Sequence, residues 1–197
     1  MKKFLFVFLF VATFFKSFSQ PKSDTTKHLT FKGVPIDGTL DDYVSKMKHN
    51  GFTFTQTQDG TAILNGDFAG YKDCTVGVST LKEKDLVYAI VVIFSQKNTW
   101  STLSGNYFDL KQMLTEKYGN PSGVVEQFDG YSQPRDDEGR MYKVKFDNCK
   151  YSSIWQTDKG EIKLSIGHSS VTTCFVNLAY FDKINSDKIR AKAKDDL

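Results

Sequence analysis

Two spacings of apolar residues alternate along the chain, and each predicts a different kind of element. Leu40, Tyr43, Val44 and Met47 recur at steps of three and four residues, which places them on one face of a helix. Thr39 directly precedes them and is a suitable N-cap. The same spacing predicts a second, longer helix through Trp100, Leu103, Tyr107, Leu110 and Leu114.

Between and after these helices, apolar residues fall at every second position, which is the period of a half-buried strand. Asp59-Gly60 separates two such segments and is typical of a tight hairpin turn. The strands predicted in the first half cover 52–55, 63–68, 74–79 and 86–95, and those in the second half cover 124–125, 141–146, 151–156, 162–166 and 174–181.

This order of elements predicts an α+β fold with antiparallel sheets, built as a duplicated helix-plus-four-strand unit. The first unit spans 31–96 and the second spans 97–181, with no linker between them. We expect a flexible polar leader at 20–30 and a charged tail at 182–197 that forms a short, fraying helix. The pattern leaves open whether the two units share one sheet or form two.

Residues 1–19 have the layout of a secretory signal peptide. Two lysines precede an apolar run over 4–15, and the small residues Ser17 and Ser19 predict cleavage near Ser19/Gln20. The run is shorter than the roughly 20 residues of a transmembrane helix, so no transmembrane anchor is expected. No cysteine lies near the cleavage point, so no lipid anchor is expected either. The sequence therefore predicts a periplasmic or extracellular protein.

The net charge of the mature chain bears on which kinds of molecule it can bind. The chain has 26 Lys+Arg and 23 Asp+Glu residues, a formal net charge of +3. Lys2, Lys3 and Lys16 fall in the signal peptide, so 26 − 3 leaves 23 basic residues against 23 acidic residues in the mature chain. A near-neutral chain has no net field that draws it onto phosphate backbones, so nucleic acid is not an expected partner.

The chain has three cysteines, Cys74, Cys149 and Cys174, and an odd number leaves at least one of them unpaired. A Cys149–Cys174 disulfide is compatible with export, and three unpaired thiols are the alternative. Cys174 also follows His168 by six residues, so strand pairing can bring a thiol and an imidazole together. Because Cys174 is in phase with the buried positions of its strand, no catalytic role is predicted for it.

Other signals of catalysis or metal binding are missing from the sequence. His28, His49 and His168 lack metal-ligand spacing and are interpreted as surface residues, and no C-x-x-C or G-x-S-x-G motif occurs. The sequence therefore predicts no catalytic residue, no metal site and no cofactor.

The longest irregular stretch, 129–140, is the candidate binding loop. It carries Tyr131, Arg135 and Arg140, which are residue types enriched at interface hot spots. Its acidic centre, 136–138, is interpreted as a solvated hairpin tip, with a calcium loop as the alternative.

Four segments resemble a family of small secreted proteins from gut-type Gram-negative bacteria. They are FKGVPIDGTLDDYVSKMKHNGF (31–52), LNGDFAGY (64–71), YFDLKQMLTEKYGNP (107–121) and WQTDKGEIKLSI (155–166). That resemblance implies no particular activity. The helix-and-four-strand plan also resembles the beta-lactamase inhibitor protein fold over most of the mature chain. This second resemblance implies a concave sheet surface suited to holding another protein, although none of the inhibitor's contact residues has a match here.

Together, these observations predict an exported, non-catalytic binding or protein-interaction module whose partner is another envelope or extracellular protein. Two alternatives stay open: a secreted hydrolase acting on envelope or environmental polymers, and an envelope assembly factor. A hydrolase requires a pocket that joins His168, Cys174 or two carboxylates.

Overall fold

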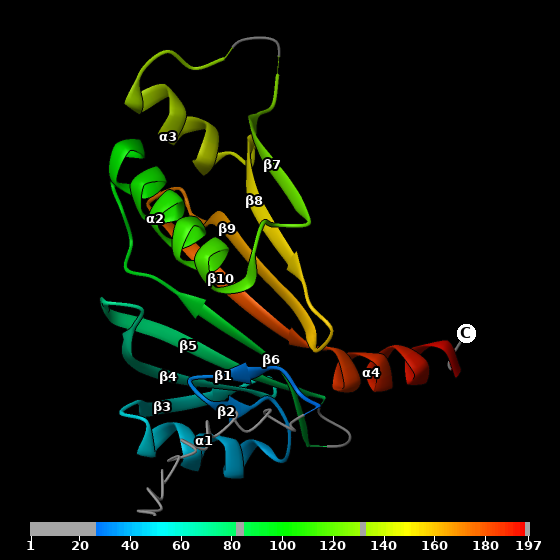
Figure 1. The fold of residues 1–197 in the computed structure, drawn as a ribbon. Helices are drawn as coiled ribbons and strands as arrows, with labels where there is room; N and C mark the ends of the chain where they lie inside the picture. The colour runs from blue at the N-terminus through cyan, green and yellow to red at the C-terminus, as the bar shows by residue number, and fades with distance from the viewer. Residues whose placement is uncertain (1–26, 82–84, 131–132, 196–197) are drawn as a thin grey trace, which may run out of the picture.

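The computed structural model describes residues 27–81, 85–130 and 133–195, and these form the expected α+β fold (Figure 1). The helices are α1 (Leu40–His49), α2 (Trp100–Tyr118), α3 (Asp137–Lys145) and α4 (Lys183–Asp195). The strands are β1 (Thr30–Phe31), β2 (Val34–Pro35), β3 (Thr53–Gln58), β4 (Thr61–Phe68), β5 (Tyr71–Leu81), β6 (Leu86–Ile93), β7 (Gly123–Phe128), β8 (Cys149–Gln156), β9 (Gly160–Ser170) and β10 (Thr173–Asp182).

The segment interpreted as a signal peptide, 1–19, lies outside the described residues. Within the described ranges, no helix has the length and apolar character needed to cross a bilayer.

Strands β3 to β10 form one antiparallel eight-stranded sheet in the order β3-β4-β5-β6-β10-β9-β8-β7. In each half of the chain a helix precedes four of these strands, α1 before β3–β6 and α2 before β7–β10. The last strands of the two halves pair at the centre, where Leu178 lies opposite Val92. This pairing answers the question left open by the sequence: the two halves share one sheet.

The register of the strands sorts the side chains onto two faces, because residues directly opposite each other point to the same side. Ile90 lies opposite Val78 and Tyr180, and all three are buried. Helices α1, α2 and α3 bury their apolar residues in the same core, so this is the inward face. One inward row runs through Ala62, Val78, Ile90, Tyr180, Ile162 and Trp155.

The two helices predicted from spacing are confirmed, and so is the N-cap predicted at Thr39. The hydroxyls of Thr39 and Thr99 each accept a backbone N–H at 3.3 Å at the start of α1 and α2. Gly119, with φ of +81°, follows the last residue of α2. Its carbonyl accepts the indole N–H of the buried Trp155 at 2.9 Å, which ties the end of α2 to β8.

The strand predicted at 141–146 is wrong, because these residues lie in or just after helix α3. Met141 and Val144 are three positions apart, share one helical face and are buried in the core. Tyr142 and Phe146 are exposed, and their ring centroids lie 4.4 Å apart. Alternation by two also fits these residues, so the sequence pattern alone could not separate the two periods.

The hairpin tip predicted at 136–138 is likewise wrong, because it is the start of α3. The Asp136 carboxylate caps this helix by accepting the Gly139 N–H at 2.8 Å. The Asp137 carboxylate accepts the N–H groups of Trp100 and Ser101 at 2.7 Å each, so it joins the start of α3 to the start of α2. Hydrogen bonding, first from the Ser101 hydroxyl, holds the pKa of the Asp137 carboxyl below its ordinary value.

Candidate functional site

The outward face of the sheet, opposite helices α1 to α3, presents its side chains in straight rows. The central row crosses all eight strands through Gln56, Ile63, Gly77, Val91, Ala179, Lys163, Ile154 and Gly123. A second row runs through Thr53, Asn65, Thr75, Ile93, Asn177, Ser165, Ser152 and Val125. A third row, toward α4, runs through Thr61, Ser79, Ala89, Phe181, Glu161 and Gln156.

These three rows form a low, nearly uncharged surface. Lys163 and Glu161 are their only ionisable residues. The polar side chains of the second row are held by bonds to each other, since the Ser165 hydroxyl donates to the Asn177 side-chain oxygen at 2.8 Å. The side chains in the middle of the central row project little from the sheet, because Gly77 and Ala179 alternate there with the short aliphatic residues Ile63 and Val91. This face can therefore accept a protruding surface without first moving long side chains.

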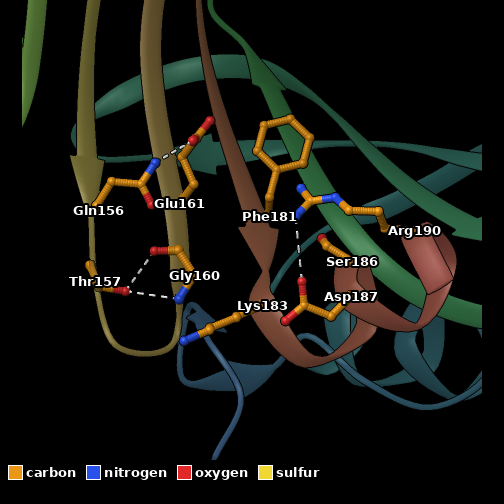
Figure 2. Close-up of a pocket in the computed structure, with 9 residues that line it drawn as sticks. All are labelled: Gln156, Thr157, Gly160, Glu161, Phe181, Lys183, Ser186, Asp187 and Arg190. Atoms are coloured by element: carbon orange, nitrogen blue, oxygen red, sulfur yellow. Dashed lines mark hydrogen bonds and ion pairs between the residues drawn. The ribbon is translucent and has the colours of Figure 1, made fainter.

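A pocket of about 540 Å³ lies at the α4 end of the outward face (Figure 2). The half-buried Phe181 ring comes from the third row, and Arg190 from α4 reaches toward it. The polar groups are partly paired: the Gln156 amide donates to Glu161 at 2.5 Å, and Arg190 lies 3.7 Å from Asp187. The residues lining the pocket are Gln156, Thr157, Gly160, Glu161, Phe181, Lys183, Ser186, Asp187 and Arg190.

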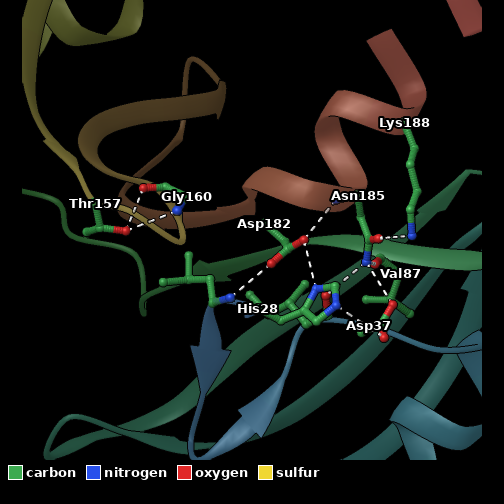
Figure 3. A network of polar contacts seen from close by, with 10 residues as sticks. His28, Asp37, Val87, Thr157, Gly160, Asp182, Asn185 and Lys188 are labelled. Carbon is green, nitrogen blue, oxygen red and sulfur yellow. Dashed lines mark hydrogen bonds and ion pairs between the residues drawn. The ribbon is translucent and has the colours of Figure 1, made fainter. Parts of the chain in front are cut away.

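A buried carboxylate fixes the point at which α4 leaves the sheet (Figure 3). Asp182, 0% exposed, ends β10 and accepts the backbone N–H groups of Asn185 and Leu29, each at 2.9 Å. The His28 ring also lies 3.1 Å from this carboxylate. The side chain of His28 is only 19% exposed, so its interpretation as a surface residue is wrong.

The Asn185 side chain completes this anchor. Its amide nitrogen donates to the carbonyl oxygens of Ile36 and Val87, at 3.1 Å and 2.9 Å, and to Asp37 at 3.0 Å. Burial raises the pKa of the Asp37 carboxyl, but hydrogen bonds from Asn185 and Gly38, together with the charge of His28, outweigh it and lower the pKa overall. These contacts hold α4 against β6 and the segment after β2, so one wall of the pocket is fixed in place.

The residues predicted for a binding loop do not join this site. Tyr131 lies outside the described residues. Arg135 is exposed in the irregular segment before α3, and Arg140 is half-buried on α3 itself. Neither arginine belongs to the three rows of the outward face or lines the α4 pocket. The candidate loop is also shorter than predicted, because α3 begins at Asp137.

Strand pairing does bring Cys174 and His168 together, since they are opposite each other in β10 and β9. The imidazole faces other partners, however: Nε2 lies 3.0 Å from Asp147, and Nδ1 lies 3.3 Å from the Ser170 carbonyl. Cys174 is fully buried, and burial raises the pKa of its thiol. A nucleophile needs an accessible thiolate and a base directed at it, and this pair provides neither. His168, half-buried, is also not the surface residue expected.

All three cysteines have free thiols in the structure, so the Cys149–Cys174 disulfide does not form there. We predict that thiol reagents label the folded protein slowly. Cys74 and Cys174 are fully buried, and burial raises the pKa of Cys149 to about 12. At pH 8 this leaves a thiolate fraction about a thousandfold below that of an ordinary cysteine. Titration with a chromogenic disulfide should report three thiols only after denaturation, and two missing thiols there would reveal a disulfide.

In comparisons with known proteins, no family model matches the chain, and no curated protein or solved structure matches it either. The functional proposal below therefore rests on the geometry of the structure. In the part of the chain that the structure describes, no group of three or more His, Cys, Asp or Glu side chains is placed to hold a metal ion.

The resemblance to the inhibitor fold implied a sheet surface that holds a partner, but sequence reasoning named no residue of the outward face or of the α4 pocket. The outward rows occupy the positions that alternate with the core residues, and small residues such as Gly77 and Ala179 at those positions were the available signal. The α4 pocket had a weaker signal, the pair Asp182 and Asn185 at N-cap spacing in a segment interpreted as a fraying tail.

Proposed function

We propose that this protein is an exported, non-catalytic interaction module that holds another envelope or extracellular protein against the outward face of its sheet. The observation that carries the proposal is the central row of that face. It crosses eight strands without a break and has Lys163 as its only charged residue. Depletion of charge is the compositional mark of an interface core.

The size of the face fits a protein partner. Eight strands at roughly 4.8 Å spacing span about 34 Å, and three rows along the strands cover about 20 Å. Their product, about 700 Å², is close to the roughly 800 Å² that each partner contributes to a standard protein interface. The α4 pocket at the end of the face would receive one projecting side chain of the partner, against Phe181.

The proposal includes a duplicated architecture like that of the beta-lactamase inhibitor protein. Its support is the topology, in which each half places a helix before four strands and the halves meet at β6 and β10. Such a union makes one sheet twice as wide as either half provides. Export rests on the sequence pattern of 1–19 and is part of the same proposal.

Polymer hydrolysis has one observation in its favour, because the α4 pocket contains two carboxylates. Their surroundings do not suit that chemistry. A general acid is kept protonated by an apolar, desolvated setting. The Asp187 side chain is 56% exposed and faces Arg190, and Glu161 accepts the amide of Gln156. The binding function is therefore the better supported one.

The test is photo-crosslinking in the source cells. A photoreactive amino acid at Val91, on the outward face, should give a single protein adduct. The same amino acid at Phe108, which is 45% exposed on α2, is the matched control and should not give that adduct. An identical pattern at both positions, or no adduct at Val91, contradicts the proposal. If the protein hydrolyses an envelope polysaccharide and the Glu161→Gln variant does not, the result would favour the hydrolase instead.

A further inference from the structure

Strand β3 is an edge of the eight-stranded sheet, since among the described strands it pairs with β4 alone. All six of its residues are exposed. Its sequence, TFTQTQ, contains neither a charge nor a proline, two devices that commonly keep other strands from pairing with an edge. β3 does carry a bulge, which is a third such device, but no charge or proline blocks its outer side, and that side can accept a further strand.

A bulge in β3 turns two side chains toward α1. The register shifts between Phe54 and Gln56, so Phe54 lies opposite Leu64 and Thr57 lies opposite Ala62. Leu64 and Ala62 both point into the core, so Phe54 and Thr57 share the inward side although they are three positions apart. Bulges commonly re-aim side chains in this way.

These two side chains form one wall of a groove of about 300 Å³, and α1 forms the other. The α1 residues of the groove are Asp41, Val44, Ser45 and Lys48. Their spacing of three, four and seven places them on one helical face. Val44, 8% exposed, and Phe54, 37% exposed, give the groove an apolar floor.

The groove carries opposite charges at its two ends. The Lys48 ammonium lies 5.3 Å from the centre of the Phe54 ring, near the start of β3. Asp41, seven residues earlier and about 10 Å along the helix, lies toward the Thr57 end. A chain running antiparallel to β3 therefore passes Asp41 first and Lys48 second.

The geometry points to a second binding site, in which an extended peptide of a partner protein pairs antiparallel with β3 as a ninth strand. Its apolar side chain rests on Phe54 and Val44, a basic residue faces Asp41, and an acidic residue faces Lys48. Side chains on one face of a strand are two residues apart, about 6.8 Å. The favoured segment therefore reads basic-x-apolar-x-acidic. Backbone pairing gives such a complex its affinity, and the groove gives it specificity.

The test is fluorescence polarisation with two labelled peptides, TKTVTET and the charge-exchanged TETVTKT. The protein should bind TKTVTET, and TETVTKT should bind about fivefold more weakly, because exposed ion pairs have modest strength. The double variant D41K/K48E should reverse this preference. Asp41 and Lys48 are both exposed, so this variant keeps the fold. Phe54→Ala should weaken binding of TKTVTET about tenfold through the lost apolar contact, whereas Phe108→Ala, which removes a similarly exposed ring from α2, should leave it unchanged.

Equal binding of both peptides, or an unchanged preference in D41K/K48E, overturns the proposal. So does a chain that sediments as a dimer and excludes the peptide, since a second copy would then occupy β3. Val91→Glu on the outward face should leave peptide binding unchanged, which separates this site from the proposed function.

Discussion

Replacing Asn185 with aspartate should lower the free energy of unfolding by about 2–3 kcal/mol, because three acceptors lose their donor while the Lys188 ammonium, 3.0 Å from the Asn185 side-chain oxygen, offsets part of the new charge. The two side chains have nearly the same shape, so the change is one of hydrogen-bond chemistry. The Asn185 amide nitrogen donates to two backbone carbonyls and to Asp37, and Asn185 is 0% exposed. An aspartate carboxylate has no hydrogen to donate and would face three acceptor oxygens. Urea denaturation followed by circular dichroism measures the loss.

Asn50→Asp is the matched control for this prediction. Asn50 also donates its amide to a carbonyl oxygen, that of Lys46 at 3.0 Å, but it is exposed at the end of α1. Water can solvate the new carboxylate there, so the loss should stay below about 1 kcal/mol. Equal losses in the two variants would show that Asn185 is not a buried anchor. Faster amide exchange confined to α4 in Asn185→Asp would show that the anchor acts on this helix.

Those parts of the fold that follow one clear period could be predicted from the sequence. Leu103, Tyr107, Leu110 and Leu114 fit only a helical face, and all four are buried on α2. Ile162, Leu164 and Ile166 fit only a strand, and they form buried positions of β9. In both cases a long run of residues repeats one period, so local preference and burial agree.

Prediction failed where a short segment fitted two periods. Met141, Val144 and their neighbours satisfy alternation by two and also a spacing of three. The deciding contacts come from elsewhere in the chain, since Asp137 bonds to the start of α2. Contacts between residues 36 positions apart in the chain cannot be found from a local pattern.

The site was harder to predict than the fold for a similar reason. The outward rows exist only because eight strands align in one register, and no single strand identifies its neighbours. Asp182 and Asn185 lie in a charged segment, and their burial depends on β6 and the segment after β2. The polar character of these residues suggested solvent, whereas the structure satisfies each of their hydrogen bonds inside the protein.

Gly160→Ala should lower the free energy of unfolding by about 3 kcal/mol, at the upper end for overpacking. Gly160 begins β9 opposite Asp182, with φ of +154°, and a Cβ atom there would lie 2.1 Å from the Phe181 carbonyl oxygen. A backbone oxygen within the sheet cannot move aside as a flexible side chain does. The junction of β9, β10 and α4 must therefore shift, and the α4 pocket with it.

Gly105→Ala is the matched control, because Gly105 lies inside α2 and an added Cβ meets nothing within 4 Å. Alanine has the higher helix propensity, so this variant should gain about 0.5–1 kcal/mol. Chemical denaturation should therefore show a lower free energy of unfolding for Gly160→Ala and a higher one for Gly105→Ala, although both variants replace glycine with alanine. A Gly160→Ala variant as stable as the parent would mean that β9 and β10 are farther apart at this position than the structure has them.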